Sequence, residues 1–357
     1  MKYSGIGGQA VMEGVMMRNG KKYAVAVRKP DHEIEVKVEN DKASLFDEKW
    51  NKVPMVRGVL SFIDSLVLGM STLMYSASFF EDEEEERTEK QRSRKKKTKI
   101  DEEDDSVSES DTLPDQMGDT KKTDTKRQES DDPENQKKKE RAEKALMGGT
   151  LVFSIVLAVA IFMILPYYLS QLFQRFITDN ANLVAIFEGI LRLVIFIGYI
   201  LLISRMQDIQ RVFMYHGAEH KCINCIEHGM DLTVENVRKC SKEHKRCGTS
   251  FLMYVIVISI ILYLFIRVDS HALRIVIRLL LIPVIAGLSY ELIRLAGRSD
   301  NRLIQILSKP GLWMQGLTVK EPDDEMIEVG IASVEAVFDW KPFVEEVRSS
   351  EASQAKS

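Results

Sequence analysis

Long apolar runs alternate with polar stretches along the second half of the chain. Four of them approach the roughly 20 residues that a membrane-spanning helix needs, and they cover residues 151–169, 183–203, 251–266 and 275–295. A fifth run, 56–80, is long enough to cross a bilayer but contains Arg57 and Asp64. It predicts a helix that is interfacial, re-entrant or spanning. The pattern indicates an α-helical polytopic membrane protein, with a four-helix membrane domain at 146–298.

Shorter alternating patterns flank this domain. Residues 23–27 and 34–38 alternate with period two around a Lys-Pro-Asp-His turn, which predicts a hairpin. Before it, three glycines surround Glu13 in a segment that suits a tight backbone turn. We therefore expect a small cytosolic α+β domain at 1–55. The C-terminal segment, 299–357, is expected to pack on that domain, adding a strand and a helix.

Composition separates one more region from these folded parts. Charged residues make up 29% of the chain and hydrophobic residues 45%, but the two classes are segregated. Residues 81–145 are almost entirely polar or charged, so they cannot bury enough surface to offset the entropy of ordering. We expect a disordered charged linker there. Its acidic and basic runs are typical of a solvated segment, and no nucleic-acid partner is expected.

The placement of Lys and Arg predicts the orientation in the membrane. Residues 205–246 contain eight basic residues, and a basic cluster precedes the first span, whereas the loops on the other side contain few. The positive-inside rule then places both termini and the polar segment 204–250 in the cytosol of a multi-pass cell-membrane protein, with lipids as partners. A reducing compartment keeps the cysteines as thiols that are available to a metal.

That polar segment contains the densest potential chemistry in the chain. It holds all four cysteines and four of the six histidines. His216, Glu219 and His220 fit the pattern H-x-x-E-H, which on a helix puts both imidazoles on one face. The two histidines are candidate ligands of a divalent metal, with zinc expected, and Glu219 is a candidate catalytic base. The third ligand is expected to be Glu227, His244 or Cys247.

Two other interpretations of the segment remain open at the level of sequence. Cys222, Cys225, His244 and Cys247 have the spacing of a four-ligand structural zinc site. Alternatively, no metal binds and the histidines form ordinary hydrogen bonds. Four ionisable residues lie inside the predicted spans: Glu188, Arg192, Glu291 and Arg294. Charged groups are costly in a bilayer. These residues are therefore candidates for a transport pathway or for ion pairs that lock helices together.

Several sequence blocks resemble the YqhQ family of bacterial membrane proteins, which are described as predicted metal-dependent enzymes. The blocks cover residues 7–18, 215–221, 232–237, 246–251 and 310–315. The resemblance implies a site built from His216, Glu219, His220, Glu227, His244 and Cys247, and it leaves out Cys222, Cys225 and Cys240. It further implies that Gln9, Glu13 and Arg18 lie near the same site, with Glu13 as a second catalytic candidate.

These observations lead to one functional hypothesis and two alternatives. The hypothesis is a metal-dependent membrane enzyme, a hydrolase that acts at the cytosolic membrane face on a lipid-linked or membrane-protein substrate. The first alternative is a transporter or channel that uses Glu188, Arg192 and Glu291. The second is a membrane-protein assembly factor with a structural metal.

Overall fold

The computed structural model describes residues 3–40, 53, 55–80, 148–266, 268, 270–297 and 301–354. It consists of two compact units, Met1–Glu81 with Pro166–Ser357, and Asp82–Leu165. The linker predicted at 81–145 lies outside the described residues. In the second unit, residues 148–159 are helical, and the π-helix η3 (Ala160–Ile164) follows. The elements described below belong to the first unit, except that the helical segment Gly148–Phe176 crosses the boundary between the two units.

A four-stranded antiparallel sheet forms the N-terminal part. Its strands are β1 (Gly7–Val11), β2 (Gly14–Asn19), β3 (Lys22–Arg28) and β4 (Ile34–Asn40), in the order β1-β2-β3-β4. The predicted hairpin is confirmed as β3–β4, with Val25 opposite Lys37. The glycine-rich segment before it forms β1 and β2, and Glu13 in their tight turn has a φ of 47°.

The two faces of the sheet bury different side chains, as the period of two requires. On one face, Val15, Met17 and Ala24 pack against helices from the later parts of the chain. On the other face, Met16 and Val25 pack with Leu68 of the fifth apolar run. The sheet is therefore the middle layer of three.

Helices make up the rest of the described chain. Their bounds are α1 (Val56–Ala77), α4 (Leu165–Phe176), α5 (Ala181–Ile203), α6 (Gln207–Glu227), α7 (Val234–Lys239), α8 (Gly248–Phe265), α9 (His271–Ala296), α10 (Arg302–Thr318), α11 (Asp324–Val337) and α12 (Trp340–Gln354). Among the described residues, five helical segments are long and apolar enough to cross a membrane: Val56–Ala77, Gly148–Phe176, Ala181–Ile203, Gly248–Phe265 and Ala272–Ala296. The chain is thus a mostly helical, multi-pass membrane protein with a small sheet.

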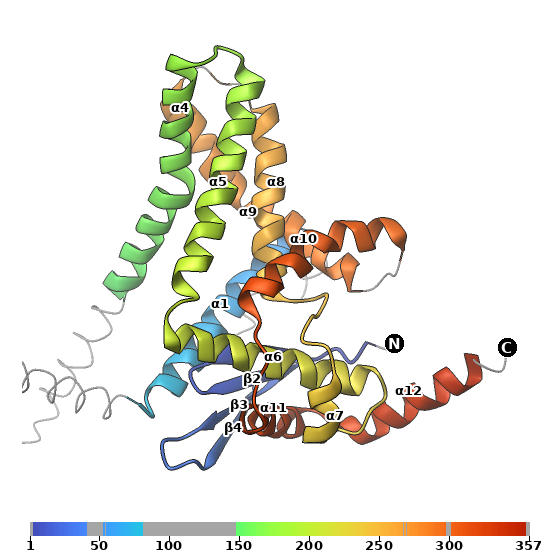
Figure 1. Ribbon diagram of the computed structural model, residues 1–357. Coiled ribbons are helices and arrows are strands. Elements are labelled where there is room, and N and C mark those ends of the chain that lie inside the picture. Colours follow the sequence, from blue (N-terminus) through green and yellow to red (C-terminus); the bar gives the residue numbers. More distant parts are fainter. Residues whose placement is uncertain are drawn as a thin grey trace, which may run out of the picture. The chain divides into compact units, whose positions relative to one another are not determined.

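Three of the candidate spanning helices and the sheet occupy opposite ends of the first unit. Helices α5, α8 and α9 extend together toward one end, while α6, α7, α11 and α12 lie with the sheet at the other (Figure 1). Helices α6 and α11 cover one face of the sheet, and their buried residues join its core. The H-x-x-E-H segment lies within α6, on the helix that its spacing predicts.

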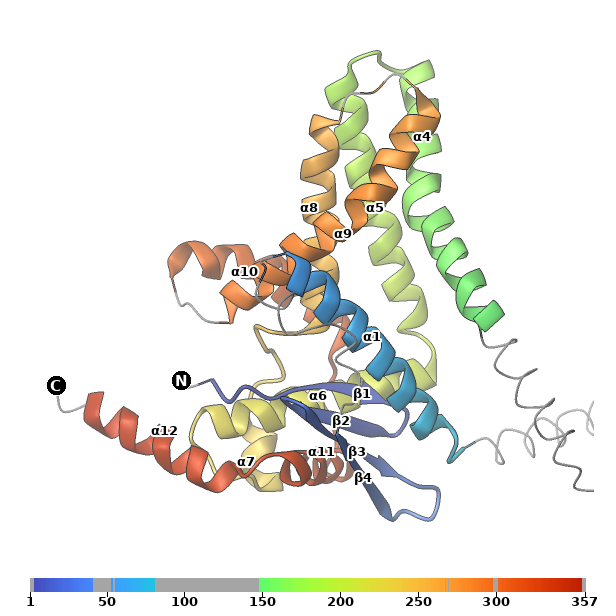
Figure 2. The same cartoon turned by 180° about the vertical axis from the view of Figure 1, so that it is seen from behind.

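Helix α1 joins the two ends. Near its start, Gly58 packs against Gly287 of α9, and Arg57 forms an ion pair with Glu291 at 2.6 Å. From there α1 runs toward the sheet (Figure 2), where Met12 N–H donates a hydrogen bond to Ser76 Oγ at 3.1 Å. One end of α1 is therefore attached to a spanning helix and the other end to the sheet.

The C-terminal segment differs from the expectation in one respect. It does pack on the sheet, because Ile327 and Val334 of α11 belong to the core shared with β2 and β3. The added strand that the sequence suggested is wrong, however, because the described residues 302–354 form α10, α11 and α12 with no strand. Pro310 and Gly311 lie inside α10. This proline is tolerated inside the helix.

The charged residues inside the spanning helices form ion pairs. Glu188 of α5 accepts hydrogen bonds from Arg192, at 2.8 Å, and from both terminal nitrogens of Arg278 of α9, at 2.6 and 2.9 Å. All three side chains are buried. Arg278 was not recognised from sequence, because its contact with Glu188 is long-range. The network connects α5 to α9, as expected of a group that locks helices together.

Candidate metal centre

Three candidate ligands lie close together, two of them on α6 and the third at the residue that precedes α8. His216 and His220 lie one turn apart on α6, and Cys247 is the N-cap residue of α8. One ligand atom from each of these residues lies within 4.8 Å of the others. Cys247 Sγ is 3.2 Å from His216 Nε2. The structure thus brings together two histidines and one of the three candidates for the third ligand.

The loop between α7 and α8 is held against α6 by side chains of α6. Asn224 donates hydrogen bonds to the carbonyl oxygens of Ser241 and Glu243 at 2.7 and 2.9 Å. Lys221 donates to the carbonyl of Arg238 at 2.9 Å. These contacts fix the loop whose end carries Cys247, so the position of the thiol is set by the residues that follow the H-x-x-E-H segment.

His220 is oriented by the same loop. Its Nδ1 lies 2.6 Å from the carbonyl oxygen of Lys242, so the ring donates its Nδ1 proton there and presents Nε2 to the pocket. A metal-binding histidine commonly has this kind of carbonyl partner, which fixes its tautomer and its ring plane. Lys242 was not recognised from sequence, because only its backbone takes part.

Glu219 faces the same pocket beside His216. Its carboxylate is 3.8 Å from His216 Nε2 and is 5% exposed. Burial raises its pKa above the usual range, against the opposing effects of His216 and a backbone hydrogen bond from Gly8. Gly8 is needed at this position, since a Cβ there would lie 2.8 Å from Glu219 Cγ and 2.7 Å from the Met16 carbonyl oxygen.

Glu227 and His244 form a second group of polar side chains next to the candidate ligands. Arg246 donates a hydrogen bond to Glu227 at 2.6 Å, and Ser4 Oγ donates another at 2.7 Å. His244 Nε2 lies 3.6 Å from Glu227. Burial alone would raise the pKa of Glu227, but the nearby His244 ring, the Arg246 charge and the Ser4 donors lower it to about 2. Burial is also the main reason that the pKa of His244 is lowered.

Gln315 of α10 fixes this second group in place. Its side-chain oxygen accepts the His244 backbone N–H at 2.9 Å, and its nitrogen donates to the His244 carbonyl at 2.7 Å. The same nitrogen donates to Ser250 Oγ of α8 at 2.9 Å. Gln315 is fully buried. Neither Gln315 nor Arg246 was assigned a role from sequence, although both lie in blocks that carried the family resemblance.

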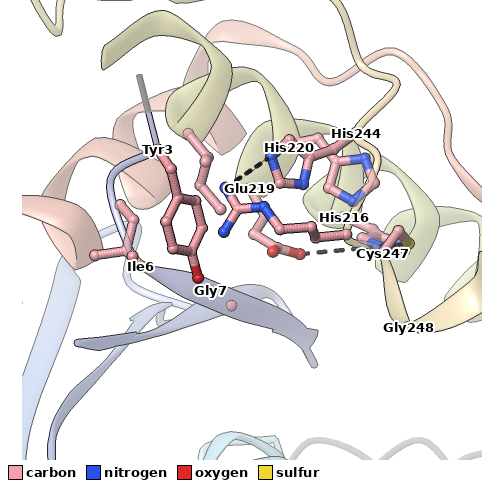
Figure 3. A pocket seen from close by; sticks show the side chains of 13 residues that line it. Tyr3, Ile6, Gly7, His216, Glu219, His220, His244, Cys247 and Gly248 are labelled. Atoms are coloured by element: carbon pink, nitrogen blue, oxygen red, sulfur yellow. Dashed lines mark hydrogen bonds and ion pairs between the residues drawn. The ribbon is translucent and has the colours of Figure 1, made fainter. Parts of the chain in front are cut away.

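The three candidate ligands, Glu219, His244 and Arg246 line a pocket of about 240 Å³, which we call the metal pocket. Figure 3 shows the rings of His216, His220 and His244 grouped beside Cys247, with Glu219 next to them. The N-terminal segment forms another wall, with Tyr3 and Gly7. Because Cys247 and Gly248 begin a candidate spanning helix, the pocket lies where the chain enters the apolar part of the molecule.

The other residues implied by the resemblance do not line the metal pocket itself. Glu13 forms an ion pair with Arg211 of α6 and accepts a hydrogen bond from Tyr215 at 3.2 Å, and it does not line the pocket. Gln9 and Arg18 line a neighbouring pocket between the sheet and α1. The catalytic role considered for Glu13 therefore has no geometric support.

The remaining cysteines belong to the packed core. Cys222, Cys225 and Cys240 are buried in the core shared by α6, α11 and the sheet. Burial raises the pKa of the Cys222 thiol above its usual range. Cys222 faces Gly330 of α11, where a Cβ would lie 2.9 Å from its sulfur. Within the described residues, the cluster with metal-ligand spacing contains neither Cys222 nor Cys225, contrary to the four-ligand structural interpretation.

The donor set fits a divalent metal of intermediate softness. Two imidazole nitrogens and a thiolate suit zinc, and ligand atoms about 2.0–2.3 Å from a tetrahedral ion lie about 3.3–3.8 Å from one another. The 3.2 Å between Cys247 and His216 is close to that spacing. Three protein ligands would leave one position for water or substrate, as in catalytic zinc sites.

Comparison with known proteins identifies relatives but no activity. The family described as "Protein of unknown function (DUF1385)" matches residues 53–340. The chain is 32% identical over 332 residues to "Uncharacterized protein YqhQ" of Bacillus subtilis (strain 168), covering 92% of this chain and 90% of that protein. No solved structure matches the chain. The expected resemblance is confirmed, while neither description mentions a metal or a reaction.

Proposed function

The chain belongs to the DUF1385 family of proteins of unknown function, and we propose that it is a metal-dependent hydrolase of the membrane. His216, His220 and Cys247 would hold the metal, and zinc is the ion that this donor set suits. The observation that carries the proposal is the convergence of three ligand atoms from α6 and the start of α8 within 4.8 Å.

The surroundings of the cluster support a catalytic rather than a structural role. A zinc ion bound by three protein ligands acts as a Lewis acid and activates water at neutral pH. Glu219 is buried at the edge of the cluster, within reach of water in the pocket, and it has the chemistry of a general base. Lys242 would orient His220, while Glu227 and Gln315 would hold Arg246 and the His244 segment in position.

The proposed location is the cytosolic face of the cell membrane. The metal pocket lies at the beginning of α8, and the basic residues of 205–246 surround the same segment of sequence. By the positive-inside rule this segment and both termini face the cytosol. A reducing compartment would keep Cys247 available as a ligand.

The ion pairs argue against the transporter alternative. Glu188 is held by two arginines, and Glu291 by Arg57, so neither carboxylate is presented to a pathway. The assembly-factor alternative has a structural metal, and the four-ligand site considered for such a metal includes Cys222 and Cys225, which lie in the core.

The proposal is tested with the purified, zinc-loaded protein against chromogenic carboxylic esters, phosphomonoesters and phosphodiesters. We expect hydrolysis of one class, which is lost on chelation and restored by zinc. A protein that contains stoichiometric metal but is inert against every class, with Glu219→Gln indistinguishable from wild type in cells, would indicate that the metal is structural.

A further inference from the structure

A second pocket lies beside the metal pocket, and we propose that it receives the phosphate-bearing headgroup of an amphiphilic substrate whose hydrocarbon chains lie along the outer face of α1. We call it the α1 pocket; it has a volume of about 390 Å³ and lies between the sheet and α1. The inference deepens the proposed function, and rests on it for the reaction at the metal. The binding step can be tested separately.

Helix α1 is apolar on its outward face and polar on its inward face, which is the reverse of a surface helix on a soluble protein. Its outward stripe is apolar and exposed, and follows helical spacing at Ile63, Leu66, Val67, Met70, Leu73 and Met74. Its inward face contains Ser61, Asp64 and Ser65, which line the α1 pocket. A continuous exposed apolar stripe indicates contact with lipid, so a polar pocket opens behind a lipid-facing helix.

The lining of the α1 pocket suits a polar group that has both an anionic and a hydrogen-donating part. Arg18 of β2 and Asp64 of α1 form an ion pair across it at 3.3 Å, and their side chains are 29% and 20% exposed. A guanidinium matches the oxygens of a phosphate, while a carboxylate accepts from hydroxyl or ammonium groups. Gln9 and Tyr290 add further polar atoms to the lining. Phospholipid headgroups have these two parts.

The two pockets share a wall without side chains. Gly5, Gly7 and Gly8 line both the metal pocket and the α1 pocket. A Cβ at Gly7 would meet no atom within 4 Å, so the space beside it is open. A headgroup that contacts Arg18 and Asp64 would therefore lie in a pocket that shares these three glycines with the metal pocket. This arrangement would allow one molecule to reach both pockets.

Binding is tested by calorimetry on the full-length protein in detergent, with three probes. Dihexanoyl phosphatidylethanolamine has both parts, glycerophosphoethanolamine has the headgroup alone, and dihexanoylglycerol has the chains alone. We expect binding of the first probe at least tenfold tighter than that of either fragment. Equal binding of glycerophosphoethanolamine would show that the pocket takes a water-soluble phosphate, and equal binding of dihexanoylglycerol would show that the headgroup contributes nothing. Either result overturns the proposal.

Variants locate the binding and separate it from the proposed reaction. Arg18→Gln should weaken binding of the complete probe at least tenfold, and Ser61→Phe, which fills the pocket without changing the ion pair, should do the same. Arg28→Gln is the matched control, because Arg28 lines neither pocket and pairs with Glu328. His216→Ala should bind the complete probe as the wild-type protein does, even when its metal is lost. The binding result can therefore be interpreted even if the metal assignment is wrong. Unchanged binding in both pocket variants, once their melting curves show folded protein, would refute the site.

Discussion

Cys247 Sγ lies 3.2 Å from His216 Nε2, although the two residues are separated by thirty-one positions and belong to the start of one helix and the middle of another. Two histidines on one face of a helix do not by themselves form a metal site, and this contact adds the third candidate ligand. The hydrogen bonds of Asn224 hold the loop before α8 to α6, and that of Lys221 holds the last turn of α7 to α6. The pair therefore defines which cysteine belongs to the site.

The first prediction concerns that choice of cysteine. Cys247→Ala should abolish stoichiometric zinc in the purified protein, because two histidines alone hold the ion weakly. Cys222→Ala should retain the metal, since Cys222 packs in the core against α11. Elemental analysis of the two variants checks this. Loss of metal in Cys222→Ala, in a protein that is still folded, would restore the interpretation as a four-ligand structural zinc site.

The second prediction separates the base from the ligands. Glu219→Gln is nearly isosteric and should keep the zinc, but an amide is a poor proton acceptor, so hydrolysis should fall by about 10²–10⁴-fold. The measurement is metal content together with the rate on the substrate class found by screening. If the variant loses its metal as well, Glu219 is a ligand and the role assigned to it is wrong.

The third prediction follows from the lowered pKa of Glu227. Its folded pKa of about 2 lies below the unfolded value of about 4.3, so the stabilisation is complete above the unfolded value and is lost as the pH falls toward 2. Glu227→Gln should reduce stability at pH 7 by about 3 kcal/mol, and the difference from wild type should shrink below about pH 4. Melting temperatures between pH 7 and pH 3 test this. The exposed Glu345→Gln is the control, and a pH-independent difference for Glu227→Gln would contradict the assignment.

The fourth prediction tests the role of the buried ion pairs. Glu188→Gln leaves Arg192 and Arg278 without their carboxylate inside the helices and should destabilise the protein by about 3–5 kcal/mol. Metal content should not change, because these residues line neither pocket. Asp179→Asn, in the exposed loop before α5, should have little effect on the melting temperature. A stable Glu188→Gln protein with altered ion flux in liposomes would instead favour transport.

The fifth prediction concerns orientation. All four native cysteines are buried, so reporter cysteines are needed. Lys239→Cys, at the exposed end of α7, should react with a membrane-impermeant thiol reagent only after the cells are permeabilised. Asp179→Cys, in the exposed loop at the opposite end of α5, should react in intact cells. The reverse pattern would place the metal pocket outside the cytosol.

Local patterns predicted much of the fold, because period and length are local properties. The β3–β4 hairpin follows from alternation, and the apolar runs give the long helices. The prediction for the tail was partly wrong, since a strand was expected where the described residues 302–354 form helices, and Gly311 of α10 packs close to Ser250 of α8. Tertiary packing of this kind is not visible in a sequence pattern.

The sequence predicted the part of the candidate site whose residues lie on one helix. The spacing of His216, Glu219 and His220 was sufficient to place all three in one pocket. The third ligand remained open among Glu227, His244 and Cys247, because the choice depends on the path of the loop. Glu227 is paired with Arg246 in the structure. The contact of Lys242 with His220 uses the backbone carbonyl, so the side chain of Lys242 gives no indication of it.

The central claim is that His216 is a metal ligand. The most direct test is elemental analysis of the protein purified without added metal or chelator, as wild type, His216→Ala and His228→Ala. His228 is the matched control, because it follows the same helix but is exposed and bonded to the Asn224 carbonyl, outside the pocket. We predict about one zinc per chain in wild type and in His228→Ala, and much less than one in His216→Ala, with all three proteins folded. Wild-type protein without metal, or His216→Ala with undiminished metal, would contradict the account.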